Sequence, residues 1–96
     1  MDMQSLLAEA KGIWGERKLS AEEICVRLGV GFGDICRYAR SASKDASTHT
    51  DAEIKKELGN LVFSSIRWCD DLGFDPEECV ALAVDCQKTF AEQAKT

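Results

Sequence analysis

Oxygen-bearing side chains recur at spacings of three and four residues in the segment that follows residue 50. Glu53, Glu57, Asn60 and Ser64 fall on one band of the helix that this segment is expected to form, because residues three or four apart stack on adjacent turns. Carboxylate and amide oxygens in such a band can ligate a hard cation such as Mg²⁺, which takes one or two carboxylates together with water and phosphate oxygens. The alternative interpretation is a solvated helix face.

Cationic side chains that could contact phosphate stand in the same segment and in the one before it. Arg27, Arg37, Lys55 and Lys56 are available, and Arg37 and Lys56 are the chosen candidates for substrate binding. Ion pairing or solvation on a helix face is the alternative for each of them. His49, the single histidine, lies just before an expected helix start and is predicted to be exposed.

Three glycines, Gly29, Gly31 and Gly33, interrupt a helical pattern. Each costs roughly 0.8–1 kcal/mol relative to alanine in a helix interior, so the cluster predicts a close approach by another group. A neighbouring helix is the favoured explanation, and room for a ligand is the alternative. A dinucleotide-binding loop is excluded, because no strand precedes the glycines and they lie in mid-helix.

The first two of four expected helices precede a polar loop at residues 41–49. The first covers about residues 2–14, with apolar residues at helical spacing. The second begins at Ser20, where Ser20 and Glu23 form a capping box, and its apolar stripe continues to Ala39. That stripe persists for about five turns.

The last two helices are joined at a glycine. The third starts at Thr50 with a second capping box that ends at Glu53, and it stops at Gly73, a typical C′ residue. The fourth opens with an acceptor and a proline, Asp75-Pro76, and is expected to fray over residues 92–96. Since no strand or hairpin signal appears, the sequence predicts an all-α bundle.

Two further features concern the surface of the third helix. Phe63 lies roughly 140° around the helix from Leu58, outside the main apolar stripe. A subunit interface is the favoured explanation, and additional intramolecular core is the rival. Asp70 and Asp71 precede the helix end and are expected to form a solvated turn.

Length and composition restrict the classes of protein. A chain of 96 residues makes a single domain, residues 1–96, whose core is marginal without a second copy. The net charge of −5 argues against binding duplex nucleic acid. No run of apolar residues is long enough to span a membrane, and no secretory signal is visible. The five cysteines, an odd number without a CxxC pair, are expected to be reduced and buried, which favours a cytoplasmic setting.

Two stretches resemble the MazG-like proteins. Glu57-Leu58-Gly59-Asn60-Leu61-Val62 is similar to a Glu-Leu-Gly-Asp-Leu-Leu phrase of that family, and the run from Leu72 to Glu78 is similar to its Leu-Gly-hydrophobic-Asp-Pro-Glu-Glu turn. Residues 28–36 resemble the family's second helix. The resemblance covers about residues 5–93 and is strongest over 53–78.

The resemblance implies a Mg²⁺-dependent pyrophosphohydrolase that converts a nucleoside triphosphate into the monophosphate and pyrophosphate, with Mn²⁺ as a substitute metal. The family's four metal-binding positions correspond to Gly31, Asp34, Glu57 and Asn60, so two carboxylates are retained, one position is an amide and one has no side chain. Glu57 is the candidate catalytic residue, and Glu53 is an auxiliary metal ligand.

The family scaffold implies a helical bundle completed by homodimerisation or tetramerisation, with a nucleoside triphosphate as substrate. The second hypothesis is a helical module on the same scaffold that binds a nucleotide or a protein without turnover.

Overall fold

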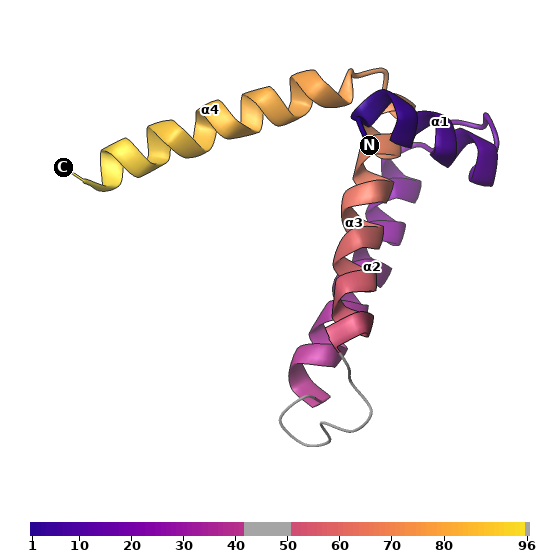
Figure 1. The fold of residues 1–96 in the computed structure, drawn as a ribbon, viewed down its shortest axis with the longest axis horizontal. Helices are drawn as coiled ribbons and strands as arrows, with labels where there is room; N and C mark the ends of the chain where they lie inside the picture. The colour runs from indigo at the N-terminus through magenta and orange to yellow at the C-terminus, as the bar shows by residue number, and fades with distance from the viewer. Residues whose placement is uncertain (42–50, 96) are drawn as a thin grey trace.

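The computed structural model describes residues 1–41 and 51–95. They form four α-helices (Figure 1): α1 (Met3–Trp14), α2 (Ala21–Ser41), α3 (Asp51–Asp71) and α4 (Pro76–Ala94). Within these two ranges no residue adopts a β-strand. The prediction of an all-α protein with four helices is therefore confirmed, and α4 ends at Ala94, within residues 92–96 where it was expected to fray.

Capping residues set the helix starts. The Ser20 hydroxyl accepts a hydrogen bond from the Glu23 backbone N–H at 3.2 Å, and Glu23 Oε1 accepts one from the Ser20 N–H at 3.2 Å. This is the predicted capping box of α2. At α4, Asp75 Oδ1 accepts from the Glu77 N–H at 3.1 Å. The second predicted box begins at Thr50, which lies outside the described residues.

A glycine turn separates α3 from α4. Gly73 has φ of 85°, a left-handed conformation that side chains with a Cβ rarely adopt. The Phe74 N–H donates to the Cys69 carbonyl at 2.9 Å, and the Gly73 N–H donates to the Asp70 carbonyl at 2.9 Å. These bonds satisfy carbonyls that the helix end would otherwise leave unpaired. After the turn, α4 leaves across the direction of α3 and away from it (Figure 1).

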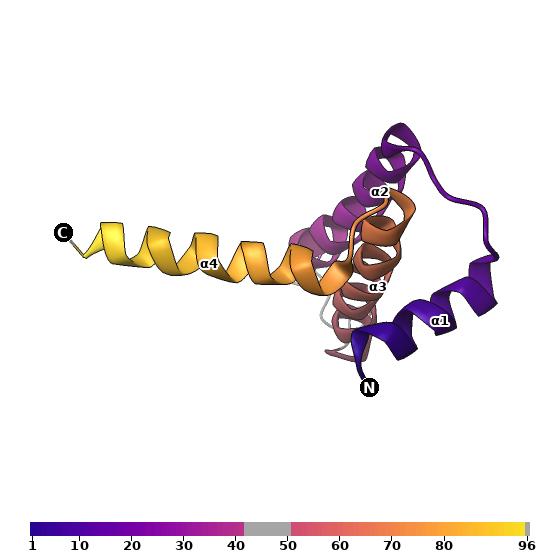
Figure 2. The same ribbon diagram turned by 90° about the horizontal axis from the view of Figure 1, so that it is seen from above.

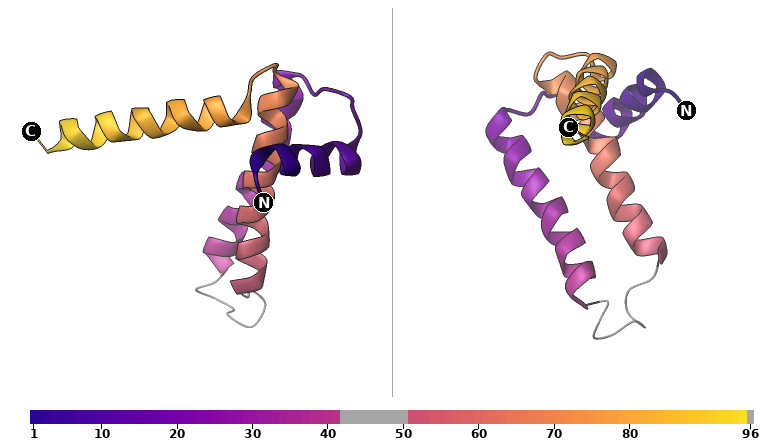
Figure 3. Two further views of the ribbon diagram at one scale, coloured as in Figure 1. Left: turned by 45° about the horizontal axis from the view of Figure 1, so that its top comes forward. Right: turned by 90° about the vertical axis from the view of Figure 1, so that its left-hand side faces the viewer.

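Helices α2 and α3 run antiparallel and pack side by side, and α1 crosses α3 near its C-terminal end (Figures 1 and 3). Helix α4 contacts α3 only close to the turn and then projects away from the other three helices, as the view from above also shows (Figure 2). Within one chain, the four helices therefore do not close into a bundle.

The buried core is small and lies where α1, α2 and α3 meet. Its buried apolar side chains are Leu7, Ala10, Ile24 and Ile66. Two charged residues of α3, Arg67 and Asp71, are buried beside them. The expectation that Asp70 and Asp71 form a solvated turn is wrong: Asp71 is buried, and Asp70 Oδ2 lies 3.5 Å from Lys11 Nζ of α1. Both carboxylates tie the end of α3 to cations.

The chain is more open than a compact monomer of its size. Its accessible surface is 7208 Å², whereas a folded monomer of this mass exposes about 5,500 Å². Its radius of gyration is 16.1 Å, compared with about 13 Å for a compact domain of this length. The excess surface of about 1,700 Å² exceeds what one partner buries in an interface of standard size.

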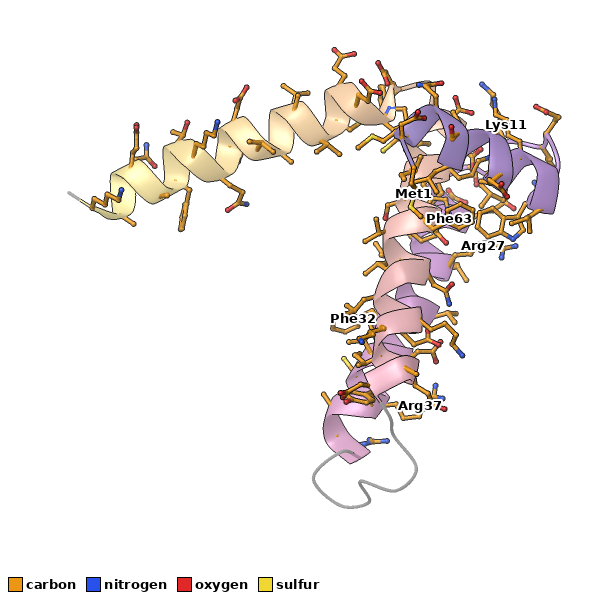
Figure 4. The ribbon with its side chains drawn as sticks, in the orientation of Figure 1. Met1, Lys11, Arg27, Phe32, Arg37 and Phe63 are labelled. Carbon is orange, nitrogen blue, oxygen red and sulfur yellow. The ribbon has the colours of Figure 1, made fainter. Side chains whose placement is uncertain are left out.

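Large apolar side chains contribute to this excess accessible surface, on α2 and on α4. The second helix turns one face toward α3, while its other apolar face is exposed and includes Phe32, which is 66% accessible. Figure 4 shows Phe32 on the opposite side of the helix pair from Arg27. Along α4, Leu82 and Phe90 are 66% and 67% accessible. The contact between α2 and α3 therefore covers only one side of the apolar stripe of α2.

The cysteine thiols also differ in exposure according to whether a neighbouring helix covers them. All five cysteines are free, as expected. Cys69 and Cys79 are half-buried near the turn between α3 and α4, but Cys25, Cys36 and Cys86 are exposed. The prediction of burial is therefore wrong for these three exposed thiols within one chain, since they lie on faces of α2 and α4 that no helix of the same chain covers.

The glycine cluster of α2 does not mark a close approach within the chain. A Cβ added at Gly29 or Gly33 would meet no atom within 4 Å, and one at Gly31 would meet only Leu61 Cδ1 at 3.9 Å, an ordinary contact. The favoured explanation, a tightly packed neighbouring helix, is wrong for the described residues. Gly31 instead lines the cleft between α2 and α3.

Candidate functional site

A cleft of about 500 Å³ lies between α2 and α3 and extends to the end of α1; we call it the main cleft. The C-terminal end of α1, the connection between α1 and α2, and the helices α2 and α3 contribute to its walls. The residues that line it are Trp14, Arg17, Leu19, Arg27, Val30, Gly31, Asp34, Glu57, Asn60, Leu61, Ser64, Arg67, Trp68 and Asp71.

The structure brings together the residues that the resemblance identified as a metal site. Gly31 and Asp34 reach the main cleft from α2, and Glu57 and Asn60 reach it from α3. Asp34 and Glu57 therefore face one space from opposite walls. The absence of a side chain at Gly31 leaves that part of the cleft open, which agrees with the alternative explanation of the glycine.

A second hollow of about 300 Å³ adjoins the main cleft and is called the lower recess here. Asp34 and Glu57 line both spaces and stand at their boundary. Glu53 lies in the lower recess and not in the main cleft, so it is not beside Asn60. Lys56 and Arg37, the candidate phosphate contacts, also line the lower recess, together with Tyr38.

The carboxylates of Asp34 and Glu57 have cationic neighbours. Arg37 Nη2 donates to Asp34 Oδ1 at 2.8 Å, one turn along the same helix, and Lys56 Nζ lies 3.8 Å from Glu57 Oε1. The Arg37 and Lys56 side chains are largely exposed, so these pairs are weakly held and exchangeable. Arg37 and Lys56 are placed to bind either the carboxylates or an anionic ligand between them.

The oxygen ligands of the main cleft are as few as a hard cation accepts from a protein. Within residues 1–41 and 51–95, no three His, Cys, Asp or Glu side chains gather in one place as a metal-binding group. Two carboxylates and the Asn60 amide oxygen around one cleft match the preference of Mg²⁺ for few protein ligands supplemented by water and phosphate oxygens. They do not make a closed cage that would hold a metal without a ligand.

A buried ion pair closes the other end of the main cleft. Arg67 Nε donates to Asp71 Oδ1 at 2.8 Å, one turn along α3, and Arg67 Nη2 donates to the Arg17 carbonyl at 2.9 Å. Arg67 thus joins α3 to the connection between α1 and α2. This pair was not predicted from the sequence. Its i,i+4 spacing was the available signal, but such pairs usually lie on exposed faces.

Aromatic side chains surround this end. Trp14 and Trp68, the two tryptophans of the chain, both line the main cleft. The Trp14 and Phe63 rings lie 5.2 Å apart between centroids and are tilted by 46°. Phe63 therefore contacts Trp14 within the chain, which agrees with the rival explanation of additional intramolecular core. The favoured explanation, a subunit interface, stays a prediction. Figure 4 places Phe63 near α1.

Arg17 lies where the cleft opens and is held by the second helix. Its guanidinium donates to Glu23 at 2.9 Å and 3.3 Å. This bond, with the Ser20 N–H, lowers the pKa of Glu23 from 4.5 to about 2, and the same pairing raises the pKa of Arg17. The capping box of α2 thus also positions a cation at the edge of the main cleft.

Comparison of the chain with protein-family models, with curated proteins and with solved structures found no match. None of the four helices, over the part of the chain that the structure describes, is long and apolar enough to cross a membrane.

Proposed function

We propose that the protein is a Mg²⁺-dependent nucleoside triphosphate pyrophosphohydrolase on a MazG-like helical scaffold, working in a reducing, cytoplasmic setting. One observation carries the proposal: the carboxylates of Asp34 and Glu57, on different helices and 23 residues apart in sequence, line the same cleft with the Asn60 amide. Helical spacing suggested Glu57 and Asn60, the resemblance added Asp34, and the geometry supports their joint use.

The charge of the cleft supports a ligand that carries its own cation. Three arginines and three carboxylates line the main cleft, so their formal charges cancel. A triphosphate alone would meet the carboxylates of Asp34 and Glu57 unfavourably. A bound Mg²⁺, or Mn²⁺ in its place, would neutralise phosphate charge and lower the pKa of an attacking water. Two retained carboxylates are then the ligands that the complex requires.

The chain's own residues would act as follows. Asp34 and Glu57 would hold the cation from opposite walls with the Asn60 oxygen, and Glu53 would support Glu57 from the lower recess. Glu57 also accepts a hydrogen bond from the attacking water, since its ammonium neighbour at 3.8 Å leaves its oxygens available. Arg37 and Lys56 release their carboxylates and bind the phosphates. Water cleaves the bond between the α and β phosphates, giving monophosphate, pyrophosphate and a proton.

A second candidate, a helical module that binds a nucleotide or protein without turnover, is favoured by a specific observation. Asp34 already has an arginine at 2.8 Å, which can replace a metal as the counter-charge. The positions occupied by Gly31 and Asn60 provide no carboxylate. A site of this kind retains the cleft and loses catalytic power.

We also propose that a second copy covers the exposed apolar faces, giving a homodimer or a tetramer. The accessible surface exceeds that of a compact monomer by about 1,700 Å², a typical contribution per chain to an obligate interface. The exposed apolar faces occur on α2 and on the projecting α4, so α4 of one copy could pack against α2 of another (Figure 1). The intersubunit packing would complete the bundle.

The test is pyrophosphate release from the common and damaged nucleoside triphosphates in the presence of Mg²⁺ or Mn²⁺. We expect turnover with at least one nucleotide, and a loss of about 100-fold or more in kcat for Glu57→Gln, the range associated with groups that act on the reacting water. The matched control is Glu22→Gln, because Glu22 is an exposed glutamate of α2 that lines neither space.

Silence with every nucleotide and both metals would overturn the enzyme proposal. Nucleotide binding measured by calorimetry under the same conditions would then favour the non-catalytic module. Equal rates in Glu57→Gln and Glu22→Gln would place any observed turnover outside this cleft.

A further inference from the structure

The end of the main cleft farthest from Asp34 and Glu57 contains two buried polar atoms without hydrogen-bond partners. They are Nη1 of Arg67 and Oδ2 of Asp71. The Arg67 side chain is 4% accessible and that of Asp71 is 1% accessible, so water does not satisfy either atom from bulk solvent. Buried donors and acceptors are nearly always paired, and an unpaired donor beside an unpaired acceptor in one cleft indicates a missing partner.

The remaining atoms of this pair are fixed in place. Arg67 Nε is bound to Asp71 Oδ1, and Arg67 Nη2 is bound to the Arg17 carbonyl. The guanidinium plane is therefore held at two points, with a third nitrogen left over. An ion pair that served stability alone could use both carboxylate oxygens in a bidentate arrangement, which is the stronger geometry. Here one oxygen of Asp71 is left unused.

The surroundings of these atoms are aromatic and apolar. Trp14, Trp68 and Leu19 line the same cleft as Arg67 and Asp71. Indole rings offer flat surfaces on which a planar heterocycle can stack, as aromatic side chains do with bases in nucleic-acid sites. Along α3, Arg67 lies about 15 Å from Glu57 at the rise of an α-helix, so the cleft separates a phosphate end from an aromatic end.

We propose that Arg67 Nη1 and Asp71 Oδ2 form a recognition subsite for a nucleobase, which stacks against Trp14 or Trp68. The arginine donates to a ring nitrogen or carbonyl of the base, and the carboxylate accepts from the adjacent N–H or amino group. All common bases present such a neighbouring acceptor and donor, so the subsite requires a base without yet selecting one. The inference deepens the proposed function, which supplies the nucleotide.

Access to the subsite involves the connection between α1 and α2. Both unpaired atoms are covered in the ligand-free chain. The Arg17 carbonyl, which Arg67 holds, belongs to this connection, and its residues 16–18 are exposed. A base therefore reaches the pair when this short segment shifts outward. The two tryptophans report such a change, because both line the cleft.

The test uses the full chain, EDTA to remove metals, and four nucleosides without phosphate: adenosine, guanosine, cytidine and uridine. We expect at least one to bind with a change in tryptophan fluorescence. Methylation of the donor nitrogen, as in 3-methyluridine or 1-methylguanosine, should weaken binding at least tenfold relative to its parent. Inorganic triphosphate, which has no base, should give no fluorescence change under these conditions.

Two variants separate the subsite from the phosphate end. Arg67→Met combined with Asp71→Leu keeps the volume filled and removes both polar groups, and it should weaken nucleoside binding at least tenfold while circular dichroism shows a folded chain. Glu57→Gln should leave nucleoside binding unchanged. If the double variant does not fold, Asp71→Asn replaces it, and this variant should change the relative affinities for the four nucleosides.

The outcomes distinguish the two proposals. Nucleoside binding without pyrophosphate release supports the subsite and overturns only the enzyme. Pyrophosphate release with an unchanged KM in the folded double variant overturns the subsite and leaves the enzyme. Failure of all four nucleosides to bind at millimolar concentration also overturns the subsite.

Discussion

Replacement of Arg67 by methionine is the sharpest test of what holds the three packed helices together. The substitution removes the partner of the Asp71 carboxylate, whose side chain is 1% accessible, and breaks the 2.8 Å bond between them. It also removes the bond to the Arg17 carbonyl. An uncompensated carboxylate then remains next to Ile66 and the small apolar core.

The expected loss is about 3–5 kcal/mol of unfolding free energy, the cost of breaking a buried ion pair at one partner. A chain of this length has about 5–14 kcal/mol in total, so the loss is a large fraction of its stability. Adding Asp71→Leu removes the stranded charge and should restore stability to within about 1 kcal/mol of the parent. Arg67 and Asp71 are therefore expected to show a coupling energy of at least about 2 kcal/mol, and more by whatever Asp71→Leu costs on its own.

The assay is urea denaturation of the parent, both single variants and the double variant at pH 7, followed by far-ultraviolet circular dichroism. Each protein is measured at several concentrations, because association would make the midpoint concentration-dependent. A coupling energy below about 0.5 kcal/mol would refute the argument, since it would mean that the two side chains do not depend on each other in the folded chain.

Three further predictions concern association, thiol reactivity and pH. Leu82→Glu should convert the oligomer into a monomer in light scattering. Ala81→Glu should not, because it adds the same charge about 100° around α4, on the face that carries Asp85, Lys88 and Glu92. A monomeric parent would contradict the proposed assembly. In the Leu82→Glu variant the three exposed thiols should react quickly with iodoacetamide at pH 8, and more slowly in the assembled parent. Burial raises the pKa of the Cys69 thiol from 9.0 to about 11. In both the parent and the variant, this thiol should therefore react about 100-fold more slowly than an ordinary thiol, as measured by peptide mass mapping. Arg17 lowers the pKa of Glu23 from 4.5 to about 2, so the stabilising effect of this carboxylate is present above pH 4.5 and lost as pH falls toward 2. The difference in Tm between the parent and Glu23→Gln should therefore shrink over that range. A constant difference would contradict the pairing of Glu23 with Arg17.

Local chemistry in the sequence was sufficient to predict the helices. Ser20 with Glu23, Asp75 before Pro76, and Gly73 after α3 each mark an end through bonds between near neighbours in the chain. Such signals do not depend on the rest of the fold, which is why they were reliable. They also placed the oxygen-bearing residues of α3 on the correct helix.

The packing could not be predicted in the same way. The apolar stripe of α2 is wide enough for two neighbours, and periodicity does not tell which of its faces meets α3 and which stays exposed, as at Phe32. Arg67 and Asp71 read as surface charges until the burial of both is known. The contact between Phe63 and Trp14 joins residues far apart in the chain, and spacing within a helix contains no information about such contacts.

The left-handed turn at Gly73 has a consequence for how such a chain can diverge. Residues 72–75 set the heading of α4, and none of them lines the main cleft. Mutations in this turn can therefore redirect the helix and alter the symmetry of association while the cleft keeps its shape. Residues 72–75 therefore affect the quaternary arrangement, whereas the residues that line the main cleft affect ligand binding, and the two sets can change independently.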